Sequence, residues 1–288
     1  MVDERISQAN GRDRPPHIGT ALPEGKTQAS GASTLQAVQN YLRQGGRLWL
    51  FLDYDGTLVP IMRTPDEAQP DGALLELLGR LAARSRIRTV VLSGRPLSAL
   101  EEMLPIPGFV RAGLYGVEID IPGEGIVTRA RAETVRRLIE QVRDEWALLV
   151  RGRQGFLVED KGMAVALHAR FASPAQVAEV MPLAQAIVTL HTTEEFRVIG
   201  GDRFLEIAPA AAHKGETVEW LFSHAPLPDA KSIYFGDDDK DEEAFLVIRK
   251  HNGIPIVVGS RQPHTAALVR LPSHADTRLW LETLISTN

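Results

Sequence analysis

Two groups of carboxylates in this chain have the spacing of a metal or proton-transfer site. Asp53 and Asp55 lie two positions apart, directly after an apolar run and before Gly56. Two carboxylates 4 Å apart repel by about 4 kcal/mol at an effective dielectric constant near 20, so we expect a cation beside them or a proton on one of them. A second group, residues 236–241 with the sequence GDDDKD, would add hard oxygen ligands of the kind that Mg²⁺ prefers.

Two further polar positions complete a set that could bind a phosphate group. Ser93 and Gly94 follow an apolar run, and Lys214 offers a compact positive charge. Each feature alone has a plainer explanation, because Asp-rich or Ser-Gly turns after strands and lysines near helix starts are common. The order and spacing of all four features along the chain favour a functional site.

The elements that must position these residues alternate between strand and helix. Continuous apolar runs predict strands buried on both faces, and apolar residues at helical spacing predict helices between them. This order predicts an α/β fold with a doubly wound, mainly parallel sheet, in which ligands bind at the carboxyl ends of the strands. The expected strands are 48–52, 87–92, 109–112, 232–235 and 254–258, and the expected helices are 33–43, 73–84, 97–103, 216–222 and 242–249.

The middle of the chain has a different pattern. Residues 121–203 contain helical spacing over 132–146 and 174–190, with strand patterns at 156–159, 164–169 and 196–199. This order does not extend a parallel sheet easily, so we expect an inserted α+β module. The predicted division is a flexible N-terminal arm at 1–32, a first core part at 33–120, the module at 121–203 and a second core part at 204–288.

Composition excludes several classes of protein. The chain has 288 residues, 44% hydrophobic and 24% charged, which is typical of a soluble globular protein. A net charge of −5 argues against nucleic-acid binding. No apolar run is long enough for a membrane span, and the absence of cysteine excludes disulfides and thiolate metal sites. We expect a cytoplasmic protein.

The four motifs, taken in order, resemble those of the haloacid dehalogenase superfamily of phosphotransferases. The first is 53–58 (DYDGTL), the second 93–95 (SGR), the third Lys214, and the fourth 236–241 (GDDDKD). The resemblance spans about residues 48 to 258. It implies a haloacid dehalogenase-like core, and residues 121–203 stand where one class of these enzymes carries its cap domain.

A narrower set of motifs is similar to the trehalose-6-phosphate phosphatase family. It comprises 113–118 (GLYGVE), 158–162 (VEDKG), 205–209 (LEIAP), Lys214-Gly215, and the continuation of the fourth motif as 241–245 (DEEAF). Two positions depart from the family pattern. Lys240 replaces the usual Thr, and Ala208 stands where Lys or Arg is common, which removes a positive charge from near the expected site.

This resemblance implies a Mg²⁺-dependent phosphatase that hydrolyses trehalose 6-phosphate to trehalose and phosphate, the last step of trehalose synthesis. Asp53 would be the nucleophile and Asp55 the acid and base, with Mg²⁺ held by Asp53, Asp237 and the backbone carbonyl of Asp55. The expected phosphate-binding residues are Ser93, Gly94 and Lys214. Thr57, Asp238 and Asp241 would orient these ligands without contacting the substrate or the metal directly. The expected substrate-binding residues are Arg95, Glu118, Glu159, Lys161 and Glu206.

Two alternatives stay open at this point. Another capped phosphatase, acting on sucrose or mannosyl phosphates, would use the same core chemistry. A receiver-type phosphoacceptor module also combines acidic residues, a hydroxyl and a lysine, but it needs no leaving-group acid such as Asp55 and no inserted module of this size. The expected partner is a small-molecule sugar phosphate, and we expect a monomer that associates with the trehalose-6-phosphate synthase.

Overall fold

The computed structural model describes residues 30–201, 203–260, 262 and 264–286. Most of the predicted arm at 1–32 lies outside these residues, although its last two positions belong to the first helix, α1 Gly31–Arg43. Ser30 caps this helix by accepting a hydrogen bond from the Ser33 amide. Among the described residues, no helix is long and apolar enough to cross a membrane.

The larger of two sheets has eight strands in the order β12-β11-β10-β1-β2-β3-β4-β5. The pairs from β12 to β3 are parallel, and β4 and β5 extend the sheet as an antiparallel hairpin. The predicted α/β class with a mainly parallel sheet is therefore confirmed. The strands are β1 Arg47–Leu52, β2 Ile87–Leu92, β3 Val110–Gly113, β4 Glu118–Ile121, β5 Gly125–Thr128, β10 Ala230–Gly236, β11 Ile254–Val258 and β12 Val269–Leu271.

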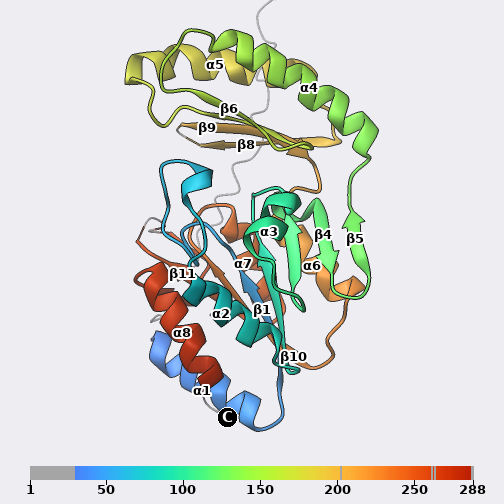
Figure 1. Ribbon diagram of the computed structural model, residues 1–288, viewed down its shortest axis with the longest axis vertical. Helices are drawn as coiled ribbons and strands as arrows, with labels where there is room; N and C mark the ends of the chain where they lie inside the picture. The colour runs from blue at the N-terminus through green and yellow to red at the C-terminus, as the bar shows by residue number, and fades with distance from the viewer. Residues whose placement is uncertain (1–29, 202, 261, 263, 287–288) are drawn as a thin grey trace, which may run out of the picture.

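Helices cover both faces of this sheet (Figure 1). Alternate residues of β1 explain the arrangement: Leu48 and Leu50 pack into one apolar layer, and Trp49 and Phe51 pack into the other. The first layer includes α1, α2, α3 and α8, and the second includes α6 and α7. Their bounds are α2 Gly72–Ala82, α3 Leu97–Met103, α6 Lys214–His224, α7 Asp241–Lys250 and α8 His274–Ser286, with short 3₁₀ turns at Pro65–Glu67 and Leu114–Gly116.

The second sheet has four antiparallel strands in the order β6-β7-β9-β8 and lies above the first (Figure 1). Two long helices, α4 and α5, cover its outer face, so its inner face looks toward the carboxyl ends of the parallel strands. The buried residues of α4 recur at helical spacing and pack on this sheet. The bounds are α4 Ala132–Leu149, β6 Leu157–Asp160, β7 Val165–His168, α5 Pro174–His191, β8 Phe196–Gly201 and β9 Phe204–Pro209.

The limits of the two sheets differ from the expected limits of the inserted module at 121 and 203. Strand β5 pairs with β4 in the large sheet, and β9 pairs with β7 and β8 in the small one. The mostly exposed β5 carries no apolar run, and β9 has the apolar content of a core strand, so neither pattern reveals its sheet. Residues 129–209 are called the cap below, and the other described residues are called the core.

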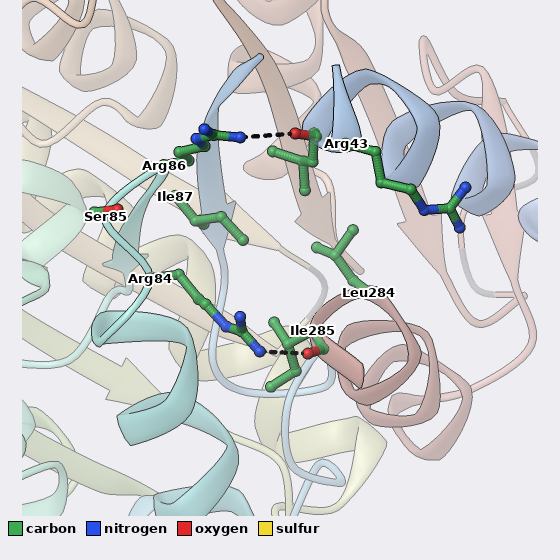
Figure 2. A pocket seen from close by; sticks show the side chains of 8 residues that line it. Arg43, Arg84, Ser85, Arg86, Ile87, Leu284 and Ile285 are labelled. Atoms are coloured by element: carbon green, nitrogen blue, oxygen red, sulfur yellow. Dashed lines mark hydrogen bonds between the residues drawn. The ribbon is translucent and has the colours of Figure 1, made fainter. Parts of the chain in front are cut away.

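A pocket of about 400 Å³ lies between α1, α8 and the turn before β2 (Figure 2). Its polar side chains have a structural role. Arg84 donates to the carbonyl oxygen of Ile285 and Arg86 donates to that of Leu42, so these arginines satisfy carbonyl groups at two helix ends. The pocket is not lined by any residue of the predicted site.

Candidate active site

The predicted clusters meet where three neighbouring parallel strands end. Asp53, Ser93 and Asp237 directly follow β1, β2 and β10, and the sheet order places β1 between the other two. The backbone amide of Asp53 donates to the carbonyl oxygen of Phe235, which ties the end of β1 to β10. All three side chains are buried. The topology therefore confirms the prediction that separate motifs meet at the carboxyl ends of the parallel strands.

Lys214 lies at the centre of the acidic cluster. Its ammonium group donates to Asp53 Oδ1 at 2.7 Å and to Asp241 Oδ1 at 2.6 Å, and its side chain is only 3% exposed. Burial disfavours the charged lysine, but Asp241 and Asp53 outweigh it and raise the pKa of Lys214 well above its ordinary value. Lys214 therefore stays a cation and fixes the position of Asp53.

Asp241 organises the loop that follows β10. Its Oδ1 also accepts a hydrogen bond from the Tyr234 hydroxyl at 2.8 Å, and its Oδ2 accepts from the backbone amides of Asp237 and Asp238 at 2.9 and 3.1 Å. Burial raises the pKa of Asp241 to about 6, although Lys214 opposes this shift. The aspartate therefore holds both the loop and the lysine.

Three buried carboxylates have the spacing of a metal site. Asp53, Asp237 and Asp241 each offer an oxygen, and these oxygens lie within 4.8 Å of one another. Burial raises the pKa of Asp53 well above its ordinary range, and the carboxylates of Asp241 and Asp237 add to this rise against the effect of Lys214. The cluster thus carries more negative charge than one lysine offsets. A hard divalent cation fits this all-oxygen donor set.

Gly56 allows the first motif to pass close to this cluster. It has a positive φ of 87°, and a Cβ built on it would lie 2.3 Å from Asp237 Oδ2. A side chain at this position would therefore displace Asp237. The Asp-x-Asp-Gly spacing thus has a structural reason: the chain must turn tightly against the carboxylate that follows β10.

The side chain of Asp55, the predicted acid and base, is paired with an arginine. It forms a two-point ion pair with Arg95, with both N–O distances at 2.8 Å, and it is not part of the three-carboxylate cluster. Arg95 also donates to the carbonyl oxygen of Pro65. Burial disfavours the Arg95 cation, but the bond to Asp55 raises its pKa. Arg95 therefore orients Asp55 in this conformation, and its role in substrate binding stays a prediction.

The second motif forms a tight turn below the cap. The Ser93 hydroxyl accepts a hydrogen bond from the Arg95 amide at 3.2 Å, and a Cβ on Gly94 would lie 2.6 Å from the Tyr115 ring. Glycine is therefore required for the close contact with Tyr115. Thr57 is fully buried, and its hydroxyl has no hydrogen-bond partner among the described residues.

Lys161 and Glu206 join the cap to this turn. The Lys161 ammonium group donates to Glu206 Oε2 at 3.0 Å and to the carbonyl oxygen of Gly94 at 3.2 Å. The Tyr115 hydroxyl donates to the same Glu206 oxygen at 3.2 Å. The second oxygen of Glu206 is buried and has no partner among the described residues. A buried carboxylate oxygen without a donor is costly, so this one is suited to receive a hydroxyl group.

The other two predicted substrate residues lie in different surroundings. Glu159 Oε2 lies 2.7 Å from His168 Nε2; burial raises the pKa of Glu159, but the hydrogen bond with His168 lowers it below its ordinary value. Glu118, at the start of β4, is not joined to this cluster by any hydrogen bond or ion pair among the described residues. Burial and the nearby Glu101 raise the pKa of Glu118. The role of Glu118 in substrate binding therefore stays a prediction.

Several residues of the site were given no role from the sequence, although Glu243 lies within the quoted motif 241–245. Tyr234 supports Asp241, His168 pairs with Glu159, and Glu243 accepts hydrogen bonds from the Lys214 amide at 3.2 Å and the Arg197 guanidinium at 2.5 Å. The Arg197 bond joins the cap to α7. Lone aromatic or charged residues inside strands and helices give no local signal, because only the packing of distant segments makes them partners.

Comparison with known proteins places the chain in a family. The family described as trehalose-phosphatase matches residues 51–275, which include all four motifs. The chain belongs to the trehalose-phosphatase family. The resemblance found in the motifs is thereby confirmed.

Two curated relatives illustrate the similarity within the trehalose-phosphatase family. A Mycobacterium bovis trehalose-phosphate phosphatase is 36% identical over 235 residues, which cover 78% of this chain and 58% of that protein. A probable trehalose-phosphate phosphatase of Sinorhizobium fredii is 32% identical and is covered to 82%. The chain thus spans less than two thirds of the mycobacterial relative.

Solved structures share the fold. The C-terminal domain of a C. albicans trehalose-6-phosphate phosphatase matches at a TM-score of 0.77 and 24% identity, covering 88% of this chain and 98% of that one. A Synechocystis sucrose-phosphatase, solved with sucrose and phosphate, matches at a TM-score of 0.52 and 17% identity, covering 81% and 96%. At identities below 25%, these matches show a shared fold only.

Proposed function

We propose that this member of the trehalose-phosphatase family hydrolyses trehalose 6-phosphate through an aspartyl-phosphate intermediate. The observation that carries the proposal is that Lys214 holds Asp53 and Asp241, which form the three-carboxylate cluster with Asp237. Lys161 of the cap bonds both Glu206 and the Gly94 carbonyl oxygen of the second motif. The core then offers a nucleophile and charge for a phosphate group. The cap offers polar groups for the sugar.

In the first step a carboxylate oxygen of Asp53 attacks phosphorus, and the bond between phosphorus and the sugar oxygen breaks. The departing oxygen takes a proton from Asp55, which must first leave its ion pair with Arg95. Lys214 and the Ser93 hydroxyl hold the oxygens of the transferring group. The products of this step are free trehalose and phosphorylated Asp53.

In the second step water attacks the phosphorus of the intermediate while Asp55 accepts its proton. The bond to Asp53 then breaks, which releases phosphate and regenerates the carboxylate. A bound Mg²⁺ would neutralise charge that otherwise repels the phosphate dianion, with Asp53, Asp237 and the backbone carbonyl of Asp55 as the proposed ligands. Asp241 would keep Lys214 in place, and Asp238 would support the same loop.

The cap would recognise the sugar through hydrogen bonds to its hydroxyl groups. Trehalose is neutral and rich in hydroxyl groups, and a site built to pair hydroxyls rejects compounds that lack them. Lys161 offers donors, and Glu206 offers an acceptor oxygen that has no partner among the described residues. Glu159 lies on β6, which β7 separates from the strand of Glu206. The inner face of the cap sheet would also exclude water from the reacting phosphorus.

A phosphate-release screen tests this function. The chain would be assayed with trehalose 6-phosphate, sucrose 6-phosphate, glucose 6-phosphate, mannosyl phosphates and p-nitrophenyl phosphate, with and without Mg²⁺. We expect kcat/KM for trehalose 6-phosphate to exceed that of every other sugar phosphate by at least about tenfold. A preference for another sugar phosphate would contradict the substrate but keep the chemistry, and no release from any ester would contradict both.

Three further expectations accompany this proposal. They are a monomeric state, association with a trehalose-6-phosphate synthase and a cytoplasmic location. Size-exclusion chromatography with light scattering, alone and after mixing with the synthase, would test the first two. Fractionation of cells that produce the chain would test the third.

A further inference from the structure

Lys240, which stands where the family usually has threonine, reaches from the core to the cap. Its ammonium group donates to Asp238 Oδ2 at 3.1 Å and to Asp239 Oδ1 at 2.8 Å, and it lies 5.7 Å from the centre of the Phe204 ring. Lys240 belongs to the loop after β10, whereas Phe204 is the first residue of the cap strand β9. Ammonium groups within about 6 Å of an aromatic ring are attracted to its face.

Phe204 lies on the same side of β9 as Glu206, because side chains two positions apart share one face of a strand. The Lys161 ammonium group lies 6.0 Å from the centre of the same ring, and His168, which is opposite Phe204 in the sheet, lies 5.2 Å from it. The ring therefore borders the residues that would read the sugar. The contact between Lys240 and this ring links the loop after β10 to the strand that carries Glu206.

The geometry points to Lys240 as a positioning residue. Through its contact with Phe204, it holds the cap over the loop that follows β10. This inference rests on the proposed function, because it assigns Lys240 to the sugar-reading side of that site. Asp238 and Asp239 hold the ammonium group, and only 18% of the Lys240 side chain is exposed. The threonine usual at this position is too short to span the distance to Phe204.

The second departure from the family pattern is independent of this contact. Ala208 is buried two positions after Glu206, and the residue opposite it on β8 is Arg197, which pairs with Glu243 of α7. A cation beside position 208 therefore already joins the cap to the core, and the Lys240 contact lies near the other end of β9.

The test compares Lys240→Met with wild type in steady-state kinetics. Methionine keeps the apolar stem and removes the ammonium group. We expect KM for trehalose 6-phosphate to rise about three- to tenfold, with kcat changed less than about twofold, since the contact orders the cap before chemistry. Activity on p-nitrophenyl phosphate, which needs no sugar reader, should stay within about twofold. Lys240→Arg keeps a cation near the ring and should remain close to wild type.

Lys250→Met is the matched control. Lys250 lies on α7, is 69% exposed and pairs with Glu219, so the change removes one surface charge at a distance from the cap. It should leave KM unchanged. If Lys240→Met leaves KM unchanged as well, or lowers kcat on both substrates equally, the positioning role is wrong.

A double variant separates positioning from direct substrate binding. Phe204→Leu should raise KM to a similar extent as Lys240→Met, and the two changes together should cost no more than either alone, because they break one contact. Losses that multiply would overturn the proposal by showing that Lys240 contacts substrate independently. Circular dichroism would establish that each variant is folded.

Small-angle X-ray scattering without substrate keeps this proposal distinct from the proposed function. Lys240→Met should increase the maximum dimension relative to wild type and Lys250→Met, because one of the contacts that hold the cap to the core is lost. If the wild type prefers another sugar phosphate, the substrate proposal fails, and the KM comparison is made with that compound. Unchanged scattering together with unchanged KM would overturn the positioning role alone.

Discussion

The core and the cap differ in how their buried carboxylates are paired. In the core, Asp53, Asp237 and Asp241 crowd around Lys214, and burial with mutual repulsion raises the pKa of Asp53 and Asp241. In the cap, each acidic residue of the site has its own partner: Glu206 has Lys161 and Glu159 has His168. The core therefore has a place for a further cation, whereas each of these two cap carboxylates already has a hydrogen-bonded partner.

This difference matches the two halves of a sugar phosphate. A phosphate dianion approaches a carboxylate nucleophile only where added positive charge offsets the repulsion. A neutral sugar needs donors and acceptors that are held in place without a large net field. The comparison implies that changes in the core should remove chemistry and that changes in the cap should alter substrate choice.

The largest expected effect is the loss of the nucleophile. Asp53→Asn should lower phosphate release from every ester at least about a thousandfold, because the amide keeps the shape but cannot attack phosphorus. The measurement is single-turnover phosphate release, with circular dichroism to establish the fold. Activity above about a thousandth of wild type, in protein free of contaminating phosphatase, would contradict the covalent mechanism.

A second prediction concerns the excess negative charge of the core. Chelation with EDTA should remove activity on all substrates, and Mg²⁺ should restore it. Ca²⁺ should inhibit, since it favours a looser coordination geometry. Asp237→Ala should raise the Mg²⁺ concentration needed for half-maximal activity at least about tenfold. Full activity in EDTA would mean that Lys214 alone balances the cluster and that the carboxylates are structural.

The order of the core could be predicted because each buried strand ends in a polar motif. The apolar run before Asp53 and the acidic loop after residues 232–235 fix two strand ends, and parallel topology then brings them together. The hairpin of β4 and β5 was missed because β5 is mostly exposed and lacks an apolar run. Helix α8 and strand β12 follow the last motif and were not predicted, although buried residues of α8 such as Trp280, Leu281 and Leu284 recur at helical spacing.

Partnerships across the site were harder to predict. The sequence suggests the Asp55 side chain as the acid and base and Arg95 as a substrate residue, and it does not reveal that the two side chains pair with each other. Likewise, the third carboxylate of the metal-spaced cluster is Asp241, which was expected behind the site. Spacing along the chain places residues at a strand end, but side-chain rotamers decide which neighbours they contact.

The third prediction tests the paired carboxylates of the cap. Glu206→Gln should lower kcat/KM for trehalose 6-phosphate about tenfold to a hundredfold, equivalent to about 1–3 kcal/mol, because an amide replaces the unpaired acceptor oxygen. The loss on p-nitrophenyl phosphate should be much smaller. Lys161→Met leaves Glu206 buried without its cation, so its thermal stability must be measured alongside activity. Equal losses on both esters would show that Glu206 supports the core.

The smallest expected effect concerns the pair of Glu159 and His168. The hydrogen bond with His168 lowers the pKa of Glu159 below its ordinary value of 4.5 against the effect of burial, so folding favours the ionised carboxylate. The stability that this provides is present above about pH 4.5 and is lost as the pH falls through the lowered pKa. Glu159→Gln should therefore unfold more easily than wild type at about pH 6, by less than about 1 kcal/mol, and the difference should shrink below about pH 4. Urea unfolding at both pH values measures this, with the exposed Glu140→Gln on α4 as a control that should show no such difference. If the difference in free energy of unfolding instead widens toward acid pH, the fold does not favour the ionised carboxylate. The hydrogen bond between Glu159 and His168 would then not stabilise the cap.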